Sequence, residues 1–398
     1  MTTFVIIGAG LAGAKAAEAL REQGHDGEIA LIGDEQLPPY ERPPLSKSYL
    51  AGTSAWEDAL VHPEAWYAEN QIDLRRGARA DAIHPERHVV VVGGEELPYD
   101  KLLLATGSTP RHLPGDDNLR HFRRRADSDA IRSQFGAGRI VIVGGGWIGL
   151  EVAATARQAG TDVTVLEAAE LPLLAALGPE MGQVFAELHR DHGVDLRTGV
   201  SVDELHADGV RLADGTAIDA DTVLIAIGAR PDTELAEAAG LAVDNGVLVD
   251  ASLRTSDPDI YAVGDIANAE HPFLKQRVRV EHWANALNQP AIAAAGMLGR
   301  TAQYDRLPYF YTDQYDLGME YVGHAPSGSY AEVVVRGDRA GREFVAFWLD
   351  ASRHVLAGMN VNVWDVGDPI KALITSRTRI DPKKLADPDV PLDEVTSE

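Results

Sequence analysis

Two glycine-rich stretches decide the fold: FVIIGAGLAGAKAAEAL at residues 4–20 and RIVIVGGGWIGLEVAATA at residues 139–156. Each begins with a short apolar, β-branched run, continues through three spaced glycines and ends in a helical pattern. This strand–turn–helix order around G-x-G-x-x-G is typical of dinucleotide-binding folds. The first glycines, Gly8 and Gly144, lie one domain length apart. The duplication therefore predicts two related dinucleotide-binding domains rather than a short repeat.

The first turn has the residues that a bound pyrophosphate requires. Gly8 permits a tight turn, Gly10 lets the backbone approach the phosphates, and Gly13 lets helix and strand pack closely. The helix N-terminus that follows favours an anion. An acid about 20 residues further on is expected to hold the adenosine ribose, and Asp34 stands there. The predicted site comprises Gly8, Gly10, Leu11, Ala12, Gly13, Asp34 and Glu35.

The second turn repeats the pattern and indicates which nucleotide binds. Glu167 ends the strand VTVLE, where an acid suits a free ribose hydroxyl and repels a 2′-phosphate. Ala168 and Ala169, which follow, offer no cation. The sequence thus favours NADH over NADPH, with a vestigial second site as the alternative. The predicted site comprises Gly144, Gly146, Trp147, Ile148, Gly149 and Glu167.

Composition excludes several classes of function. The 398 residues carry a net charge of −25, which repels nucleic acid and anionic membranes. The chain has no cysteine, which excludes disulfides, thiolate-bound metal clusters and thiol nucleophiles. We predict no metal site. No stretch has the length and apolar character of a signal peptide or a membrane span, so we expect a soluble, cytoplasmic protein.

Further motifs carry a family resemblance over essentially the whole chain. Besides the two glycine turns these are RPPLSK, LLLATGSTP, AIGARP, TSDPDIYAVGD, VEHWANAL and FYTDQYDLG. With these motifs the chain resembles the FAD-dependent pyridine nucleotide-disulfide oxidoreductase superfamily. Within it, the chain is most similar to the oxygenase-type ferredoxin reductases, the putidaredoxin reductase and biphenyl dioxygenase ferredoxin reductase group. It resembles apoptosis-inducing factor more distantly.

The resemblance implies the domain organisation. It predicts an α/β fold with two Rossmann-like dinucleotide-binding domains of the glutathione reductase type and a C-terminal α+β domain. The FAD-binding domain is expected to be discontinuous, with residues 1–110 and 245–312, and the NAD(H)-binding domain to span residues 111–244. From Asp313 aromatic and β-branched runs predict an antiparallel sheet. Residues 313–398 are thus expected to form the C-terminal domain and to dock the partner.

The resemblance also implies roles for residues around the flavin. It places Lys47 of RPPLSK near flavin N5, paired with Glu151, and both are predicted to be catalytic. Asp265 is expected to bind the ribityl chain. Arg42 either shapes the same loop, with Pro44, or is a surface charge. The remaining cofactor-binding residues are predicted to be Ala80, Thr106, Gly107, Gly228, Glu281, His282 and Trp283.

Three of these assignments leave alternatives open. His282 has either a direct role at the flavin or a structural one. Glu281 is a candidate contact of the nicotinamide. Tyr311 stands where relatives often carry tryptophan, so it either stacks near the nicotinamide or is an ordinary core aromatic.

The missing cysteines narrow the activity within the superfamily. Disulfide reductases need a redox-active cysteine pair, and NADH peroxidases and many NADH oxidases need one cysteine. The leading hypothesis is therefore hydride transfer from NADH to FAD, then single-electron transfer to a ferredoxin that feeds a cytochrome P450 or Rieske-type oxygenase. The alternatives are a rubredoxin reductase, an NADH oxidase-like flavoprotein, and a redox sensor like apoptosis-inducing factor.

Ferredoxins are typically acidic, so an acidic reductase needs a local basic surface to attract one. Two groups of basic residues, named below, are candidates for this surface. We prefer the second group because it lies in the C-terminal domain. The alternative for each group is a charged face that is exposed to water and docks no partner. We expect a monomer or a homodimer. The groups are Arg123, Arg124 and Arg125, and then Arg377, Arg379, Lys383 and Lys384.

Overall fold

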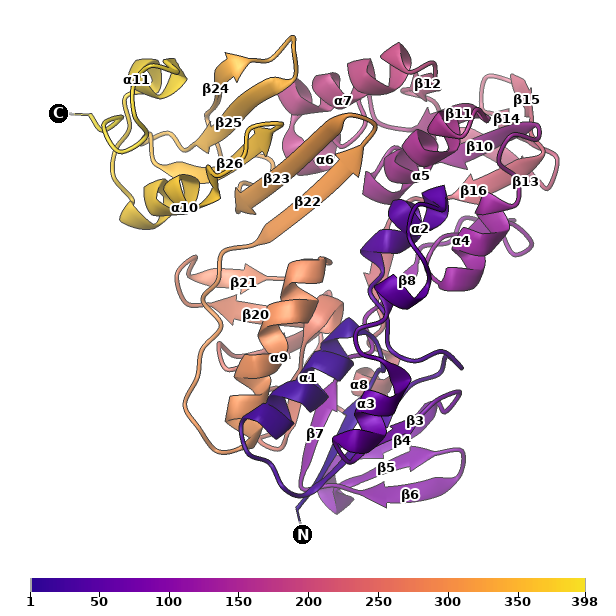
Figure 1. Cartoon of the computed structure of the whole chain (residues 1–398), viewed down its shortest axis with the longest axis vertical. Helices are drawn as coiled ribbons and strands as arrows, with labels where there is room; N and C mark the ends of the chain where they lie inside the picture. Colours follow the sequence, from indigo (N-terminus) through magenta and orange to yellow (C-terminus); the bar gives the residue numbers. More distant parts are fainter. Residues whose placement is uncertain (1, 398) are drawn as a thin grey trace. The chain divides into compact units, whose positions relative to one another are not determined.

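The computed structural model describes residues 2–397, which form two compact units (Figure 1). The first unit comprises Met1–Pro44, Ser54–Thr109 and Ala229–Arg306; the second comprises Leu45–Thr53, Pro110–Gly228 and Leu307–Glu398. The short loop segment Leu45–Thr53 thus belongs to the second unit, whereas the sequence placed it in the FAD-binding domain. The division into three domains stays a prediction.

A parallel five-stranded sheet forms the centre of the first unit. Its middle strand is buried on both faces, with Val5 and Ile6 fully buried, which suits its unbroken apolar sequence. The strands, in spatial order, are β19 (Ile260–Ala262), β7 (Lys101–Leu104), β1 (Thr3–Ile7), β2 (Glu28–Ile32) and β3 (Ile72–Arg75).

Helices α1 (Leu11–Glu22) and α9 (Trp283–Met297) pack against each other and against this sheet (Figure 1). Two short helices and two small sheets complete the unit. They are α3 (Glu64–Glu69) and α8 (Glu234–Ala238), the sheet of β4 (Ala80–His84), β5 (Val89–Val92) and β6 (Glu95–Pro98), and the sheet of β18 (Val247–Val249), β20 (Ala267–His271) and β21 (Gln276–Val278). The strands β8 (Ser108–Pro110) and β17 (Ala229–Pro231) pair with each other.

The second unit repeats the parallel sheet. Its strands, in spatial order, are β12 (Asp195–Thr198), β11 (Asp162–Glu167), β10 (Arg139–Val143), β16 (Thr222–Ile225) and β9 (Arg120–His121). Its helices are α2 (Ser48–Ala51), α4 (Arg125–Arg132), α5 (Trp147–Gln158), α6 (Leu174–Leu177) and α7 (Pro179–Asp191). A small antiparallel sheet joins β13 (Val202–His206), β14 (Gly209–Leu212) and β15 (Ala217–Asp219).

The same unit contains a five-stranded antiparallel sheet near the C-terminus. Its strands, in spatial order, are β22 (Tyr309–Gln314), β23 (Leu317–Gly323), β26 (Val355–Val361), β25 (Glu343–Leu349) and β24 (Glu332–Asp338). Helix α10 (Gly367–Ser376) packs on β23 and β26, and α11 (Pro382–Ala386) packs on β24 (Figure 1). The sheet begins at Tyr309, before the boundary expected at residue 313, because the aromatic run that opens β22 is already paired with β23.

Each unit has its own apolar core. The core of the first unit surrounds its parallel sheet, whereas the main core of the second unit includes residues of both its parallel and its antiparallel sheet. Alanines of α1 and of α5, such as Ala14 and Ala153, are fully buried and let each helix approach its sheet closely. Among residues 2–397, no helix is both long enough and apolar enough to cross a membrane.

Candidate functional site

The first glycine turn joins β1 to α1 and shows why each glycine is needed. Gly8 has a φ of +110°, and a Cβ there would lie 2.1 Å from the carbonyl oxygen of Ala105. A Cβ on Gly13 would lie 1.9 Å from the carbonyl oxygen of Gly8. Packing within the protein therefore requires both glycines.

Gly10, at the N-cap of α1, differs from its two neighbours. Its φ of −91° is open to any residue, and a Cβ there would meet no atom of residues 2–397 within 4 Å. The free space lies at a helix N-terminus, where backbone N–H groups favour an anion. The turn thus fits the pyrophosphate of a dinucleotide, and Leu11 and Ala12 continue it as the buried start of α1.

The second turn, between β10 and α5, has the same geometry. Gly144 has a φ of +114°, and a Cβ on Gly149 would lie 2.2 Å from the carbonyl oxygen of Gly144. Gly146, at the N-cap of α5, has a φ of −82° and again no atom of the described chain within 4 Å of a Cβ. The two turns therefore present the same accessible helix N-terminus, one in each unit.

An acidic residue stands near the end of the second strand in both units: Asp34 lies just after β2, and Glu167 is the last residue of β11. Asp34 is exposed just after β2, and neighbouring Glu35 accepts hydrogen bonds from the Tyr40 hydroxyl at 2.8 Å and from Arg42 at 3.2 Å. Arg42 is therefore half-buried and paired with an acid rather than a free surface charge.

Glu167 holds its own glycine turn in place. Its Oε2 accepts a hydrogen bond from the backbone N–H of Gly145, and its Oε1 accepts one from Ala169, each at 2.7 Å. The carboxylate therefore lies beside the glycine turn that precedes α5, with a fixed orientation. This position suits a ribose hydroxyl and disfavours a second negative charge.

Two other residues predicted at this turn have different environments. The indole ring of Trp147 packs against Phe185 and Phe310, with ring centroids 5.7 and 5.0 Å apart, so it belongs to the core. Ile148 is 41% exposed, which is unusual for a large apolar side chain.

Gly228 has a φ of +95°, and its carbonyl oxygen accepts a hydrogen bond from the backbone N–H of Arg111 at 2.9 Å.

Several residues predicted to bind the cofactor lie at strand ends of the first unit. Asp265 follows β19 in a short 3₁₀ turn, where its Oδ2 accepts a hydrogen bond from Ser108 at 2.7 Å. Thr106 follows β7 and donates to the carbonyl oxygen of Asp232 at 2.9 Å. Gly107, with a φ of +73°, accepts from the Asp232 N–H at 3.0 Å, and Ala80 is buried at the start of β4.

The turn before α9 has mostly structural contacts. His282 is the N-cap of α9, and its Nδ1 accepts a hydrogen bond from the Ala284 N–H at 3.4 Å. Trp283 donates its indole N–H to Glu41 at 2.9 Å. Glu281 is paired with Arg279 at 2.6 Å. The capping contact supports the structural reading of His282.

Lys47 and Glu151 form a buried ion pair. Lys47 precedes α2 and Glu151 lies in α5, and Lys47 Nζ is 2.7 Å from Glu151 Oε1. The Lys47 side chain is 17% exposed and the Glu151 side chain 5%. The ammonium also lies 5.4 Å from the centre of the Tyr311 ring, within range of a cation–π contact. Tyr311 thus contacts the predicted catalytic lysine from β22.

Glu151 also belongs to a buried polar network that we did not predict from the sequence. Ser46 donates to Glu151 Oε2 at 2.5 Å, and Thr312 donates to Oε1 at 2.7 Å. Gln314 donates to the Thr312 hydroxyl at 3.2 Å, and its Oε1 lies 2.8 Å from His189 Nε2. Burial lowers the pKa of the His189 imidazole to about 4, against the opposing effect of the Gln314 hydrogen bond. His189 is therefore neutral at pH 7 and donates to Gln314.

The structure contains two parallel sheets with glycine-rich turns and one antiparallel sheet. This combination defines an α/β reductase with two dinucleotide-binding sites. The chain belongs to the pyridine nucleotide-disulphide oxidoreductase family, whose sequence profile matches residues 2–289. The profile of a reductase C-terminal domain matches residues 309–396. The expected family and fold class are thereby confirmed.

The relatives point to one branch of this family. The chain is 40% identical to putidaredoxin reductase of Pseudomonas putida, over 98% of this chain and 96% of the relative. It is 41% identical to the ferredoxin–NAD(+) reductase component of the anthranilate 1,2-dioxygenase system of Burkholderia cepacia, over 98% of both chains. The crystal structure of a covalent putidaredoxin reductase–putidaredoxin complex matches with a TM-score of 0.93, 39% identity and coverage of 99% of this chain and 98% of that one.

The two candidate basic surfaces differ in their environment. Arg125 donates to the Tyr49 hydroxyl at 3.0 Å and lies 3.4 Å from Asp129, so part of the first group is engaged within the protein. In the second group Arg377, Arg379, Lys383 and Lys384 are all exposed, on the end of α10 and on α11. The acidic residues Asp381, Asp387 and Asp389 alternate with them along the chain.

Proposed function

We propose that this protein is an NADH-dependent ferredoxin reductase that supplies electrons to a cytochrome P450 or Rieske-type oxygenase. The observation that carries the proposal is the similarity of the chain to reductase components of such systems. The identity is 40–41%, and the matches cover 98% of the chain. The absence of cysteine from the sequence is consistent with direct transfer of electrons from the flavin to the partner.

In this proposal each glycine turn holds one dinucleotide. The turn of Gly8, Gly10 and Gly13 receives the pyrophosphate of FAD, with Asp34 at the ribose and Asp265 at the ribityl chain. The turn of Gly144, Gly146 and Gly149 receives NADH, with Glu167 at the ribose. The bound flavin supplies the redox chemistry, since it accepts a hydride and releases electrons singly.

The role of Lys47 follows from its charge and burial. A buried ammonium stabilises negative charge that develops on a neighbouring group during reduction. Glu151 reduces the free-energy cost of burying that ammonium, and Ser46 and Thr312 fix the carboxylate through hydrogen bonds. We propose that Lys47 acts on the flavin and that Glu151 positions Lys47.

The first test is whether the purified protein holds one non-covalent FAD and oxidises NADH with a ferredoxin as acceptor. Candidate ferredoxins are compared in a cytochrome c reduction assay, alongside rubredoxin and oxygen. Turnover with a ferredoxin well above turnover with rubredoxin or oxygen supports the proposal. A correctly folded protein that does not bind FAD contradicts it. A long-lived complex with NADH and slow turnover with every acceptor would favour the redox-sensor alternative.

Two further expectations belong to the same proposal. We expect a cytoplasmic location, which cell fractionation of the native source tests. We expect a monomer or a homodimer, which light scattering of the purified holoprotein tests.

A further inference from the structure

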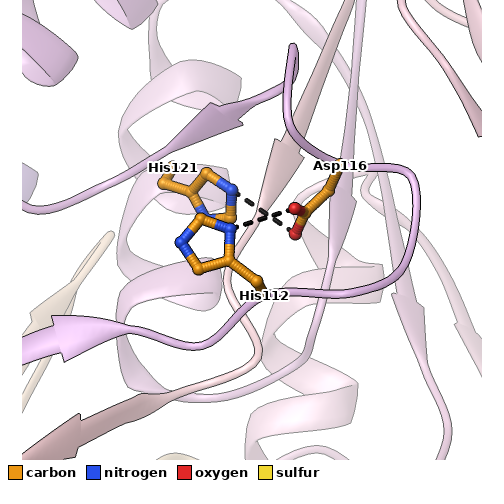
Figure 2. Close-up of side chains that lie close together, drawn as sticks. All are labelled: His112, Asp116 and His121. Carbon is orange, nitrogen blue, oxygen red and sulfur yellow. Dashed lines mark hydrogen bonds and ion pairs between the residues drawn. The ribbon is translucent and has the colours of Figure 1, made fainter.

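Two histidines and a buried aspartate converge in the second unit, outside the residues assigned to FAD or NADH (Figure 2). His112 follows strand β8, Asp116 lies in the next turn, and His121 ends strand β9. Strand β9 pairs with β16, opposite Ile225, and this pairing brings His121 back beside the loop. We predicted no metal site from the sequence; the cluster forms only when β9 joins the sheet.

The three side chains lie close enough together to share one metal ion, with each imidazole facing one oxygen of the Asp116 carboxylate. His112 Nδ1 is 3.0 Å from Asp116 Oδ1, and His121 Nε2 is 3.4 Å from Asp116 Oδ2. With one ligand atom taken from each residue, the three atoms lie within 4.8 Å of one another. Ligands bound tetrahedrally at zinc distances are about 3.3 Å apart, close to both separations. Figure 2 shows the carboxylate facing both imidazole rings, whose centroids are 4.2 Å apart.

His121 provides an independent observation that points to a ligand. Both of its ring nitrogens are buried; Nδ1 has no hydrogen-bond partner among residues 2–397, and Nε2 has only the 3.4 Å ion-pair contact with Asp116. A buried, unsatisfied polar group is rare in folded proteins and is commonly explained by a water or an ion. The His121 side chain is 16% exposed, so bulk water solvates it poorly.

The surroundings complete the requirements for a site. Asp116 is 1% exposed, and its Oδ2 accepts a hydrogen bond from the Leu113 N–H at 2.7 Å, which orients the carboxylate as second-sphere contacts orient metal ligands. The His112 side chain is 60% exposed, which leaves a path for an ion and room for water as a fourth ligand.

We propose that His112, Asp116 and His121 bind one divalent transition-metal ion of the zinc class. Two imidazoles and one carboxylate suit Zn²⁺ and its neighbours in the first row, whereas Mg²⁺ and Ca²⁺ prefer oxygen ligands alone. The ion joins the loop that carries His112 and Asp116 to the edge strand that carries His121. Since the site forms only in the folded chain, the ion stabilises the second unit. This inference does not depend on the proposed redox function.

The test uses the FAD-loaded protein without a histidine tag, after removal of metal by a chelator. Co²⁺ is titrated and followed by its visible absorption, and Zn²⁺ is then used to displace it. We expect one equivalent to bind, Zn²⁺ to displace Co²⁺, and millimolar Mg²⁺ to have no effect. Zn²⁺ is also expected to raise the Tm of the wild-type protein.

Two variants and a matched control assign the site. His112→Ala removes an exposed ligand, so the fold is preserved, and Asp116→Asn keeps the shape of the buried side chain. We expect each to weaken Zn²⁺ binding by more than ~100-fold, above the effect of losing a second-sphere contact. The control is His354→Ala, because His354 Nδ1 lies 3.0 Å from Asp350 in a pair like that of His112 and Asp116 but without a second histidine. The control is expected to bind Zn²⁺ normally.

Three outcomes overturn the proposal. The first is no saturable binding of Co²⁺ or Zn²⁺. The second is binding that His112→Ala leaves unchanged, or that His354→Ala weakens equally, because the ion then sits elsewhere on the surface. The third is competition by Mg²⁺ at similar concentration, which contradicts the ligand chemistry.

Discussion

The Lys47 ammonium lies 2.7 Å from Oε1 of Glu151, and the two side chains are only 17% and 5% exposed. Two charges at this depth interact through a medium less polar than water, so removal of one leaves the other at a high free-energy cost. The hydrogen bonds from Ser46 and Thr312 hold the Glu151 carboxylate in its position beside Lys47. The pair therefore acts as one unit in any experiment on either residue.

Lys47→Ala should impair reduction of the flavin more than it weakens binding of NADH. The variant removes a positive charge and leaves Glu151 unpaired, a loss on the order of 3–5 kcal/mol for a buried pair. We expect stopped-flow reduction by NADH to slow and the flavin midpoint potential to fall by ~30 mV or more, where 30 mV is about 1.4 kcal/mol for a two-electron couple.

Two further variants make this prediction sharper. Adding Glu151→Gln to Lys47→Ala removes the uncompensated charge, so the potential should recover in part. Lys101→Ala breaks the more exposed pair with Asp259 and should change neither quantity. Unchanged rate and potential in Lys47→Ala would mean that Lys47 has no electrostatic role at the flavin.

Gly10→Ala should reduce FAD affinity without destabilising the FAD-free protein. Its backbone φ is ordinary, and its Cβ would enter space free of other described atoms, so the free energy of unfolding should change by less than about 0.5 kcal/mol. The comparison is Gly13→Ala, whose Cβ would lie 1.9 Å from the Gly8 carbonyl oxygen and should destabilise the fold by about 1–3 kcal/mol. Denaturant unfolding and FAD titration measure both effects. Undiminished FAD affinity in Gly10→Ala would contradict the assignment of this turn.

Glu167 should set the preference for NADH over NADPH. Glu167→Gln removes the charge and retains one oxygen that can accept from the backbone, so kcat/KM for NADPH relative to NADH should rise about tenfold, or about 1.4 kcal/mol. Glu167→Arg should shift the ratio further but lower both values, because the hydrogen bonds to Gly145 and Ala169 are lost. Glu170→Arg, which reverses an exposed charge three residues on, is the control for general electrostatics. A wild-type ratio near one would contradict the prediction.

His189 should make stability fall as the pH is lowered from about 6.5 to about 4. Burial lowers its folded-state pKa to about 4, while the unfolded chain has an ordinary histidine pKa of about 6.5. Between these values the unfolded state binds more protons, so stability rises with pH, by at most about 1.4 kcal/mol per unit. His189→Gln should flatten this part of the curve relative to wild type, measured by denaturant unfolding at several pH values. An equal slope in the variant would show that other groups dominate.

The glycine turns were predictable from sequence because the G-x-G-x-x-G spacing is a local pattern, although the contact of Gly8 with Ala105 is not local. A positive φ at Gly8 and the close approach of Gly13 to Gly8 involve residues within one turn and one helix. Family resemblance placed Lys47 with Glu151, and the structure contains that ion pair; its action on a flavin stays a prediction.

The network behind Glu151 was not predictable, because its members come from distant parts of the chain. Thr312 and Gln314 lie on one buried face of β22. In the sequence, two polar residues at alternate positions are typical of the face of a strand that is exposed to solvent. Only the packing of β22 against α5 and the position of His189 in α7 turn that face into an interior network. His121 was overlooked for the same reason, since β9 must pair before it meets His112.

Docking of the ferredoxin is expected to depend on the exposed lysines of α11. The protein as a whole is strongly acidic, at −25, so an acidic partner is repelled at long range. Exposed charges interact over about 10 Å at 0.1 M salt, so a local cationic surface acts at close approach. The lysines of α11 are exposed, but Asp381 precedes them and Asp387 follows them, which weakens the local field.

Charge reversal at one of these lysines therefore decides whether this surface attracts the partner. Lys383→Glu should raise the KM for ferredoxin several-fold and leave NADH-to-ferricyanide activity intact, because ferricyanide needs no protein docking. Rising salt should weaken the wild-type reaction and have less effect on the variant. Lys275→Glu makes the same charge change at an exposed position of the first unit and should leave the KM unchanged. If salt accelerates the wild-type reaction, or both variants behave alike, net repulsion dominates and the ferredoxin binds elsewhere, through apolar contacts.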